Sequence, residues 1–503
     1  MTGTLAGPLR EAAAATPDRV LIREGDVALT CRELLSDAES LAHALSARMP
    51  VGSVVSFMVP NWHEAAVVYL GATLAGMVVN PILPSLRDHE LRYILTDADA
   101  RAIFIPGSFA GHDYVAMLDR VRADMPAPPE VVVLRGASSS HTAFSDLLTE
   151  TSRQPMPSPP SSADRMLMYT SGTTGRPKGV LHSHDSLNAL IMQLGEYWHI
   201  DAGDTFLVPS PIAHIGGSIY AFECPLLLGT QAVLMERWDP DTAVELMLAH
   251  RCTHMAGATP FLDGLLTAAQ RADTRLPDLK VFICGGASVP PSLIRRGAGY
   301  FDKAQVTRVY GSTEVPVTTV GSFDDLDSAA ETDGCPGIAD VKLVDGEIRV
   351  RGPQMLRGYL HPDDNRESFD AEGYFRTGDL GRRTDGGQLV VTGRAKDLII
   401  RNGENISPKE VEDLLVTHPQ IVEVAVVGVP DPRTGERACA AIVPAGVPGP
   451  EVAVLKEFLM ARGVAKFKIP EQVAFFDALP KNAAGKVLKH QIRTTLTEES
   501  ECR

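Results

Sequence analysis

The chain has 503 residues, 44 % of them hydrophobic and 22 % charged, which is an ordinary composition for a folded protein of two or more domains. The formal net charge of -16 argues against sequence-independent nucleic-acid binding and against a polybasic membrane anchor, since both need a basic face. The seven cysteines are dispersed and form no C-x-x-C pair, so we expect reduced thiols and a cytoplasmic location.

Over the first four hundred residues, short apolar runs alternate with helix-length stretches, a pattern typical of parallel, buried strands in an α/β fold. The apolar run 65–79 is short for a membrane span and is interrupted by Gly71 and Gly76, so it predicts a buried core helix. The runs expected to be strands are 53–59, 78–83, 102–106, 130–134, 165–170, 205–209, 232–236, 280–286 and 306–311.

After about residue 335 the pattern changes to hairpin signals. Asp345-Gly346 separates two apolar runs, and a second hairpin-like pair is formed by 388–393 and 397–406. Ser407 is expected to cap a helix, with Glu410 completing a capping box. The last hundred or so residues resemble a separate α+β unit.

The stretch "TSGTTGRPKG", residues 170–179, combines glycines, hydroxyls and cations. A strand is predicted before it and a helix-compatible stretch after it. Glycines let the backbone approach a ligand, and the hydroxyls with Arg176 and Lys178 can meet phosphate oxygens, so we interpret the stretch as a polyphosphate loop. It is not a Walker loop, and a flexible surface turn is the alternative interpretation.

Polar residues also gather in four later segments: "YGSTE" (310–314), "YFRTGDL" (374–380), "GRAKDLI" (393–399) and "PKNAAGKVLK" (480–489). A tyrosine can stack on a base, and a glutamate can hold Mg²⁺ against phosphate oxygens. An aspartate in a glycine turn can accept two ribose hydroxyls. Together these segments favour a nucleotide ligand.

At this point the chain resembles the adenylate-forming superfamily, which unites acyl-CoA synthetases, peptide-synthetase adenylation domains and firefly luciferase. The similarity runs essentially end to end, through "ALTCRELLSDAESLAHAL", "LGATLAGMVVNPILP", "YTSGTTGRPKGV", "YGSTE", "GEIRVRGPQMLRGYL", "YFRTGDLG", "GRAKDLIIRNGENISPKEVE" and "LPKNAAGKVLK" in order. Cys31 stands where an aromatic residue is usual.

The resemblance implies a ligase that joins a carboxylate to AMP, releases pyrophosphate and then passes the acyl group to a thiol, with ATP, Mg²⁺ and coenzyme A as cofactors. It assigns catalysis to Lys486, Glu314, His214 and Thr174, with Glu314 and Thr174 also serving the magnesium ion. It assigns nucleotide binding to Thr170, Ser171, Gly172, Thr173, Thr174, Gly175, Lys178, Gly285, Gly286, Ala287, Tyr310, Gly311, Ser312, Thr313, Asp379 and Arg394.

The resemblance also implies an α/β fold with a large N-terminal domain, 1–396, built from stacked α/β subdomains and a β-rich subdomain. A small, mobile α+β domain, 397–503, would rotate about a hinge at Asp397 and carry Lys486 away after adenylation. Gly403 and Glu404 would then line a tunnel for coenzyme A, although a plain hairpin glycine is the alternative for Gly403.

The expected acyl pocket comprises His214, Gly216, Gly217, Ser218, Gly257, Ala258, Gly286 and Gly311. Its lining is uncharged, which suits an apolar acyl tail, and no aspartate lies between Asp204 and Trp238 to hold an amino group. The many small residues would leave room for a bulky alicyclic, polycyclic or aromatic acid, or would let neighbouring helices pack closely.

Three alternatives stay open: a medium-chain fatty acid–CoA ligase, a free-standing acyl-AMP ligase that loads an acyl carrier protein, and a non-catalytic nucleotide- or acyl-binding protein. The expected partners are a small carboxylic acid and coenzyme A, without nucleic acid or stable membrane insertion. The sequence does not distinguish a monomer from a homodimer.

Overall fold

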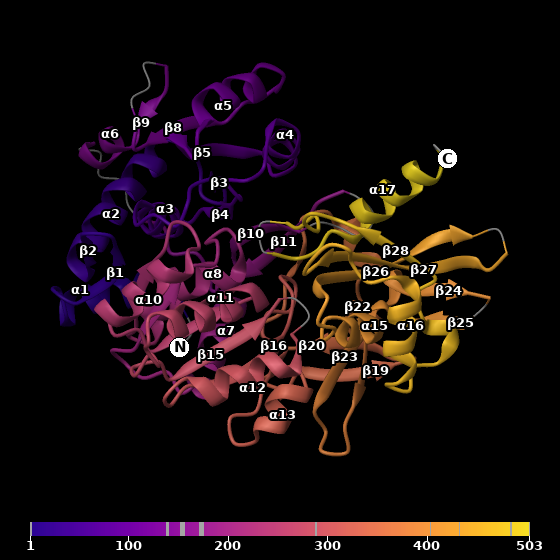
Figure 1. Ribbon diagram of the computed structural model, residues 1–503. Helices are drawn as coiled ribbons and strands as arrows, with labels where there is room; N and C mark the ends of the chain where they lie inside the picture. Colours follow the sequence, from indigo (N-terminus) through magenta and orange to yellow (C-terminus); the bar gives the residue numbers. More distant parts are fainter. Residues whose placement is uncertain are drawn as a thin grey trace.

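The computed structural model describes residues 3–136, 140–150, 156–170, 176–286, 289–402, 404–431, 433–482 and 485–501. The fold contains two α/β layers, an antiparallel sheet and a small C-terminal α+β domain (Figure 1). The two layers are interleaved along the chain, because the N-terminal strands β1 and β2 join the second sheet. The predicted mixed α/β class, with its β-rich part and small C-terminal domain, is confirmed. The predicted domain boundary between residues 396 and 397 stays a prediction.

The first sheet lies in the N-terminal part and is parallel from β10 through β4, β3, β5 and β8 to β9. Its strands, in spatial order, are β21 (Gly358–Tyr359), β11 (Lys178–Ser183), β10 (Asp164–Thr170), β4 (Val78–Pro81), β3 (Val54–Phe57), β5 (Ala100–Pro106), β8 (Glu130–Leu134) and β9 (Thr142–Ala143). Its helices are α1 (Ala6–Ala15), α2 (Cys31–Arg48), α3 (Glu64–Leu74), α4 (Asp88–Asp97), α5 (Tyr114–Ala123) and α6 (Phe144–Thr149), and β6 (Ser108–Phe109) pairs with β7 (His112–Asp113).

The second sheet is parallel from β16 to β1 and is completed by antiparallel strands at both edges. Its order is β18 (Cys335–Pro336), β17 (Thr319–Val320), β16 (Gln305–Tyr310), β15 (Val281–Gly285), β14 (His254–Gly257), β12 (Thr205–Val208), β13 (Gln231–Leu234), β1 (Val20–Glu24) and β2 (Val27–Thr30). The helical elements of this part are α7 (His184–Tyr197), α8 (Ile215–Ser218), the π-helix η1 (Ile219–Glu223), α9 (Cys224–Leu227), α10 (Pro240–Ala249), α11 (Thr259–Arg271), α12 (Pro291–Tyr300) and α13 (Leu326–Glu331).

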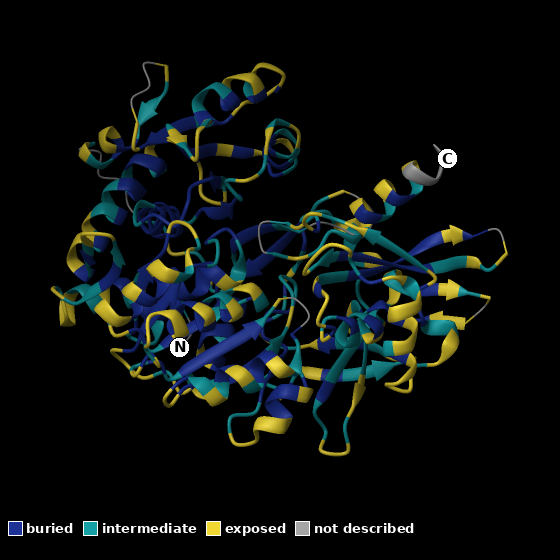
Figure 2. Ribbon diagram, viewed as in Figure 1, coloured by how far each residue is buried: buried dark blue, intermediate teal, exposed yellow. Residues whose placement is uncertain are grey.

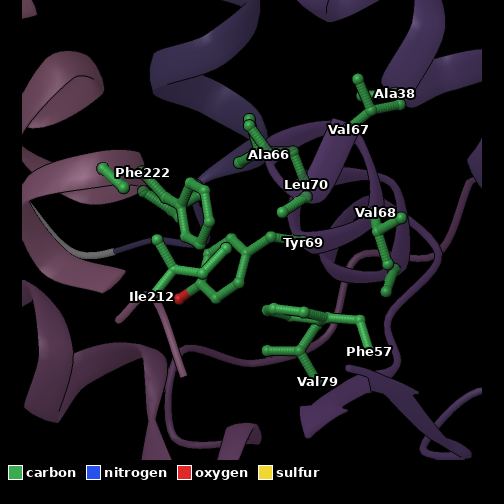
Figure 3. Packing of buried hydrophobic residues seen from close by; sticks show 14 of the residues in the cluster. Ala38, Phe57, Ala66, Val67, Val68, Tyr69, Leu70, Val79, Ile212 and Phe222 are labelled. Atoms are coloured by element: carbon green, nitrogen blue, oxygen red, sulfur yellow. The ribbon is translucent and has the colours of Figure 1, made fainter. Parts of the chain in front are cut away.

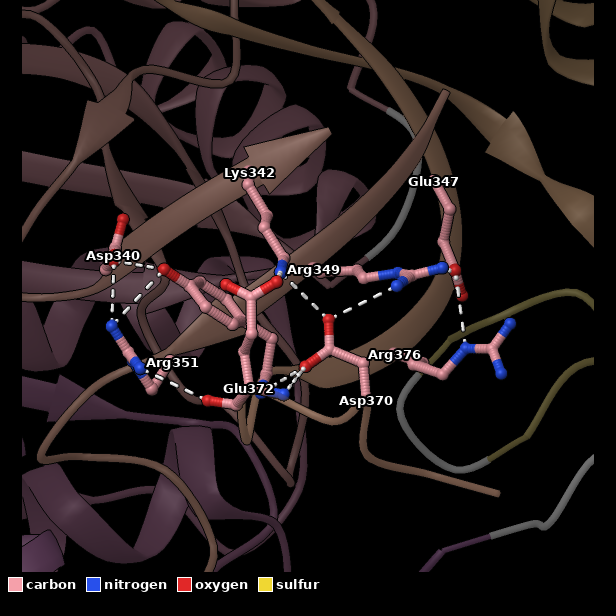
Figure 4. Close-up of polar contacts among 9 residues, drawn as sticks. Asp340, Lys342, Glu347, Arg349, Arg351, Asp370, Glu372 and Arg376 are labelled. Atoms are coloured by element: carbon pink, nitrogen blue, oxygen red, sulfur yellow. Dashed lines mark hydrogen bonds and ion pairs between the residues drawn. The ribbon is translucent and has the colours of Figure 1, made fainter. Parts of the chain in front are cut away.

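An antiparallel sheet follows, and its polar surface is held by ion pairs (Figure 4). Oδ2 of Asp370 lies 3.0 Å from Nζ of Lys342 and 3.2 Å from Nη1 of Arg349. The predicted hairpin at Asp345-Gly346 is confirmed, with both residues at positive φ. The elements are β19 (Asp340–Val344), β20 (Glu347–Arg351), β22 (Phe375–Arg383) and β23 (Leu389–Arg394), with α14 (Pro362–Arg366) before β22.

The small C-terminal domain contains the remaining elements. They are β24 (Ile399–Arg401), β25 (Glu404–Ile406), α15 (Pro408–Leu415), β26 (Ile421–Asp431), β27 (Gly435–Pro444), α16 (Val452–Met460), the 3-10 helix η3 (Lys466–Lys468), β28 (Gln472–Phe475) and α17 (Lys489–Glu501). A 3-10 turn, η2 (Ala395–Asp397), connects this domain to β23.

Two local predictions in this region are wrong. Strand β23 pairs with β22, and β24 pairs with β25, so 388–393 and 397–406 do not form one hairpin. Ser407 precedes α15 as predicted but makes no capping hydrogen bond. Its hydroxyl donates instead to the carbonyl of Thr392 at 2.5 Å, because the chain folds back against β23 at this point.

The two α/β layers share one hydrophobic core (Figures 2 and 3). Helix α3 is buried along its whole length, as predicted for the run 65–79. Tyr69 of α3 stacks on Phe222 of η1 with ring centroids 4.8 Å apart.

Among the described residues, no helix is both long and apolar enough to cross a membrane.

A charged pair lies inside this shared core. Nη2 of Arg165 is 2.8 Å from Oε2 of Glu223, and both side chains are fully buried. The hydroxyl of Tyr69 also donates to Glu223. Each charge has lost its hydration, so the pair is stable only while both partners are present.

Replacing Glu223 by alanine should therefore destabilise the fold by about 3–5 kcal/mol, since Arg165 would stay buried without its counter-charge. Asp18→Ala removes the exposed Asp18–Arg32 pair and should cost about 1 kcal/mol or less. Urea unfolding followed by tryptophan fluorescence measures both. Equal unfolding midpoints for the two variants would contradict the role of the buried pair.

Candidate active site

Asp379 lies at the meeting point of polar side chains from distant segments. It stands opposite Arg394 in the β22–β23 pair, with Oδ1 2.9 Å from Nε of Arg394. The hydroxyl of Tyr310, at the end of β16, donates to Oδ2 of Asp379 at 2.8 Å. Burial and then the Asp379 charge raise the pKa of Tyr310 well above its ordinary value, so the phenol stays a donor. These contacts join the second α/β sheet to the antiparallel sheet.

Lys486 comes to the same place from the C-terminal domain. Its backbone N–H donates to Oδ1 of Asn482 at 2.9 Å, and the N–H of Asn482 donates to the Lys486 carbonyl at 2.9 Å. Gly485 has a φ of 79°, a left-handed conformation that glycine adopts without strain. This turn brings the ammonium group within electrostatic range of Asp379 and Arg394.

The charge around Lys486 is predominantly positive. The pKa of Lys486 is lowered to about 8, first by removal of water from the ammonium and then by the charges of Arg394 and Lys396, whereas Asp379 and Asp397 act to raise it. The residue is exposed to solvent, so the surrounding protein removes only part of the water from the ammonium. Three cations and two carboxylates leave a surplus of positive charge that an anion would neutralise.

Glu314 lies beside the strand that leads into the predicted phosphate loop. Its Oε1 accepts from the hydroxyl of Thr170 at 3.5 Å and from the hydroxyl of Tyr359 at 3.1 Å. The neighbouring carbonyl of Thr313 bonds to Nε2 of His182 at 2.7 Å. Burial lowers the pKa of His182 to about 4, so the ring is neutral at pH 7.

The predicted phosphate loop connects two antiparallel strands, since Thr170 of β10 pairs with Lys178 of β11. The expectation of a helix-compatible stretch after the loop is wrong, because β11 comes first and α7 begins only at His184. Ser171, Gly172, Thr173, Thr174 and Gly175 lie outside the described residues, as do Ala287 and Gly403.

The cations at the end of this loop have a shared counter-charge. Nη2 of Arg176 lies 2.9 Å from Oδ2 of Asp364, and Nζ of Lys178 lies 3.5 Å from Oδ1 of the same residue. Nζ of Lys178 also lies 5.0 Å from the centroid of the Tyr359 ring. A single carboxylate thus faces both cations.

His214 begins α8, and its Nε2 is buried without a hydrogen-bond partner in the part of the chain that the structure describes. Burial lowers the pKa of His214, so the ring is neutral at pH 7. A Cβ atom built on Gly216 would meet nothing within 4 Å, and the same holds for Gly286. Open space therefore borders these two glycines.

The other glycines near His214 are required by packing. Ser218 and Ala258 of the same predicted pocket are buried. A Cβ atom would lie 2.2 Å from the Pro211 oxygen at Gly217, 2.9 Å from the Phe261 side chain at Gly257, 2.6 Å from the Val309 oxygen at Gly285 and 2.6 Å from the Val317 nitrogen at Gly311. Close packing thus explains the small residues at these four positions, whereas room for a bulky acid at Gly216 and Gly286 stays a prediction.

The predicted tunnel residue Glu404 is not part of this assembly. It is exposed in β25, and Figure 1 shows the β24–β25 hairpin at the outer edge of the C-terminal domain, away from α8. The structure therefore brings Tyr310, Asp379, Arg394 and Lys486 together and leaves Glu404 apart.

Among the described residues, the group of metal-type side chains that lie within reach of one another is Glu24, His63 and Glu64. Nη2 of Arg135 lies 2.6 Å from a carboxylate oxygen of Glu24 and 2.6 Å from one of Glu64. The guanidinium already supplies the positive charge, so this cluster is an ion-paired junction between β1, α3 and the end of β8.

Family models identify the chain. The model described as AMP-binding enzyme matches residues 9–360, and the model of the AMP-binding enzyme C-terminal domain matches residues 410–486. The chain belongs to the AMP-binding enzyme family. The first model includes Tyr310 and Glu314, and the second includes Lys486, so both span residues of the assembly around Asp379.

Curated relatives cover almost the whole chain. A medium-chain fatty-acid–CoA ligase of Escherichia coli (strain K12) is 32% identical over 97% of this chain and 90% of its own length. A CoA ligase of Rhodococcus jostii (strain RHA1), named for a propanoyl group on a methyl-dioxo-octahydroindene ring system, is also 32% identical, over 97% and 98%. The resemblance to the acyl-CoA synthetase branch and the expectation of an AMP-forming acid–thiol ligase are thereby confirmed.

Solved structures agree with the family. ATP-bound MatB from Rhodopseudomonas palustris superposes with a TM-score of 0.89 at 29% identity, covering 99% of each chain. The apo form of the same protein gives a TM-score of 0.78 over the same coverage. The arrangement of this chain is therefore closer to that of the ATP-bound relative.

Sequence reasoning missed three side chains of this assembly. Tyr359 and Asp364 contact Glu314 and the loop cations, and Lys396 contributes to the charge around Lys486. Tyr359 and Lys396 lie inside motifs typical of the AMP-binding enzyme family, which was the available signal. Asp364 lies outside those motifs, and only the folded chain places it beside Arg176.

The lowered pKa of Lys486 has a measurable consequence. Its amine should be labelled by an amine-selective reagent with a midpoint near pH 8, and the labelling curve of exposed Lys456 is the reference in the same sample. Arg394→Gln removes a positive neighbour and should raise the Lys486 midpoint. Peptide mass spectrometry of protein labelled at a series of pH values measures these midpoints. Identical midpoints for Lys486 and Lys456 would refute the lowered pKa of Lys486.

Proposed function

We propose that the protein is an ATP-dependent acyl-CoA synthetase that adenylates a bulky hydrophobic carboxylic acid and transfers the acyl group to coenzyme A. The observation that carries this proposal is the convergence of Lys486 with Tyr310, Asp379 and Arg394. These residues come from three separate parts of the fold and have no common structural need to meet.

The nucleotide roles follow from the chemistry of the side chains. Asp379 keeps unused lone pairs on both oxygens and would accept ribose hydroxyls beside Arg394. Tyr310 and the backbone at 285–286 would flank the adenine. Thr170, Lys178 and the loop between them would hold the β and γ phosphates, with Arg176 at its far end.

Lys486 would act on the first reaction. A carboxylate oxygen of the acid forms a bond to the α-phosphorus of ATP while the bond to pyrophosphate breaks. The acid is already ionised at pH 7, so no base is required. The Lys486 cation would hold two anions in line and offset their repulsion in the transition state.

Glu314 fits the magnesium ion that the family implies. It is a partly exposed carboxylate whose Oε1 faces Thr170 at the entrance to the phosphate loop, and Mg²⁺ prefers such oxygens together with phosphate oxygens. The ion would neutralise phosphate charge, while Thr174 is proposed as its second protein contact from the sequence alone.

The second reaction would use the same acyl site. A thiol of coenzyme A would attack the acyl carbonyl and release AMP. Lys486 would have to leave first, and Glu404 would have to approach from the outer edge of the C-terminal domain. The proposed role of Gly403 beside it comes from the sequence alone. A hinge at Asp397, between the proposed domains 1–396 and 397–503, would allow both movements.

The proposed substrate class rests on the open space at Gly216 and Gly286 and on the uncharged residues that are predicted to line the pocket. The indenyl-propanoyl name of the Rhodococcus relative supports a broad, ringed acid. The name of the Escherichia coli relative supports a medium-chain fatty acid instead. One further function competes with this proposal, namely loading of a carrier protein.

ATP–pyrophosphate exchange without coenzyme A tests the first reaction and separates an enzyme from a binding protein. Fatty, aromatic, alicyclic and polycyclic acids are compared, and we expect exchange with the ringed acids. Lys486→Ala should lower the exchange rate about 10²–10³-fold, the usual cost of losing one transition-state partner. Lys456→Ala, at an exposed lysine of α16, is the control. Exchange that survives Lys486→Ala would refute the role of Lys486.

Filling the space at Gly216 tests the substrate class. Gly216→Leu should lower kcat/KM for ringed acids by tenfold or more and change that for short linear acids little, because the added side chain enters the space that the rings would occupy. Gly299→Leu places the same side chain in open space on α12. Equal kcat/KM values for ringed acids in wild type and Gly216→Leu would contradict the assignment.

A further inference from the structure

Arg493 lies on α17, the helix that follows Lys486. Ile492 and Leu496 of this helix are buried in the C-terminal core with strands β26 and β27. Arg493 is beside them but keeps 33% of its side chain exposed. Its guanidinium is therefore at the rim of the core, facing the connection between the domains.

The partner of Arg493 is Asp397. Nη2 of Arg493 lies 3.5 Å from Oδ1 of Asp397, whose side chain is 20% exposed. Nε of Arg493 is buried and has no hydrogen-bond partner among the described residues. The Asp397 carboxylate is thus the counter-charge of the partly buried Arg493 guanidinium in the described part of the chain.

Each partner of this ion pair is close in the sequence to a residue of the candidate site. Asp397 ends η2, three residues after Arg394, which pairs with Asp379. Arg493 lies in the second turn of α17, which begins three residues after Lys486. The backbone N–H of Leu488 donates to the Pro480 carbonyl and ties the Lys486 turn to the start of α17. One ion pair therefore connects the element that presents Lys486 to the segment that presents Arg394.

The site needs such a connection because its cations repel one another. Lys396 is surrounded by the charges of Arg394 and Arg493 as well as those of Asp379 and Asp397, and its pKa is lowered, first by loss of water and then by Arg394. Without a bound anion, the attraction between oppositely charged residues has to offset this repulsion. The Asp397–Arg493 pair is one of the contacts that does so across the connection.

We propose that Arg493 is a positioning residue: through Asp397 it holds the Lys486 segment against Arg394 and Asp379 and thereby favours adenylate formation over thioester formation. This inference rests on the proposed two-step function. The closer superposition on the ATP-bound relative than on its apo form is consistent with the arrangement that the pair would hold.

Lys489 provides a matched control on the same helix. Its Nζ lies 2.6 Å from Oε1 of Glu412, and the two side chains are 20% and 15% exposed. Glu412 belongs to α15 and also accepts from the backbone N–H of Val426. This pair lies wholly inside the C-terminal domain, so its loss should not change how that domain meets the rest of the protein.

The test compares Arg493→Met with Lys489→Met in the full-length protein, in two separate half-reactions. One is ATP–pyrophosphate exchange with the acid that wild type accepts, and the other is thioester formation from supplied acyl-adenylate and coenzyme A. Arg493→Met should lower exchange about fivefold or more and leave thioester formation equal or faster. Lys489→Met should leave the ratio of the two rates unchanged.

A double variant shows whether the effect runs through Asp397. If the pair is the cause, the loss of exchange in Asp397→Asn with Arg493→Met should be smaller than the losses of the two single variants combined. Thermal unfolding midpoints are measured for all variants, and a general loss of stability would lower both rates together. Equal losses in the two half-reactions, or additive losses in the double variant, would overturn the proposal.

The outcomes also separate this inference from the proposed function. Absence of exchange in wild type with every acid overturns the proposed function and this inference with it. The second outcome has wild-type exchange that is lost in Lys486→Ala, which supports the proposed function. If the ratio of the two rates is then unchanged in Arg493→Met, this inference alone is overturned.

Discussion

The carboxylate of Asp379 is the contact on which the candidate site depends. It accepts from Tyr310 of the second α/β sheet, pairs with Arg394 across β22 and β23, and faces Lys486 of the C-terminal domain. Three parts of the fold are thus held at one buried negative charge. Removing that charge would leave cations from two segments facing one another without compensation, so the geometry of the whole site follows from this one residue.

Most central strands of the α/β part were predictable because each is a short apolar run buried on both faces; residues 130–134, for example, form β8 with the predicted bounds. The strands β1, β11 and β14 were not predicted. Strand pairing was harder to predict. The runs 388–393 and 397–406 were expected to pair with each other, but β23 pairs with β22 and β24 pairs with β25. The fold-back of the chain at this point includes contacts such as that from Ser407 to the Thr392 carbonyl. Local patterns fix which residues form a strand, whereas distant contacts decide which strand it joins.

The candidate site was predictable to a similar extent. Ordered motifs pointed to Tyr310, Asp379, Arg394 and Lys486, and the fold brings them together. A motif does not say what surrounds a small residue, however. Gly216 and Gly217 are adjacent in the sequence, yet a side chain has open space at the first and would meet the backbone oxygen of Pro211 at the second. Only the packed structure separates a glycine beside open space from a glycine packed against backbone.

Because the protein has a large negative net charge, binding of an anionic nucleotide depends on how the domains are arranged. A chain of net charge -16 repels a polyanion at long range, so an anionic nucleotide needs a local surplus of cations. In this structure, the surplus around Lys486 includes Arg394 and Lys396, which lie outside the segment that presents Lys486. An anion bound there would in turn stabilise the same arrangement, since a ligand favours the state that binds it more tightly. Release of an anion such as pyrophosphate would then restore the repulsion among the cations and weaken the contact between the domains. Electrostatics alone thus couples the proposed first reaction to the domain movement that the second requires.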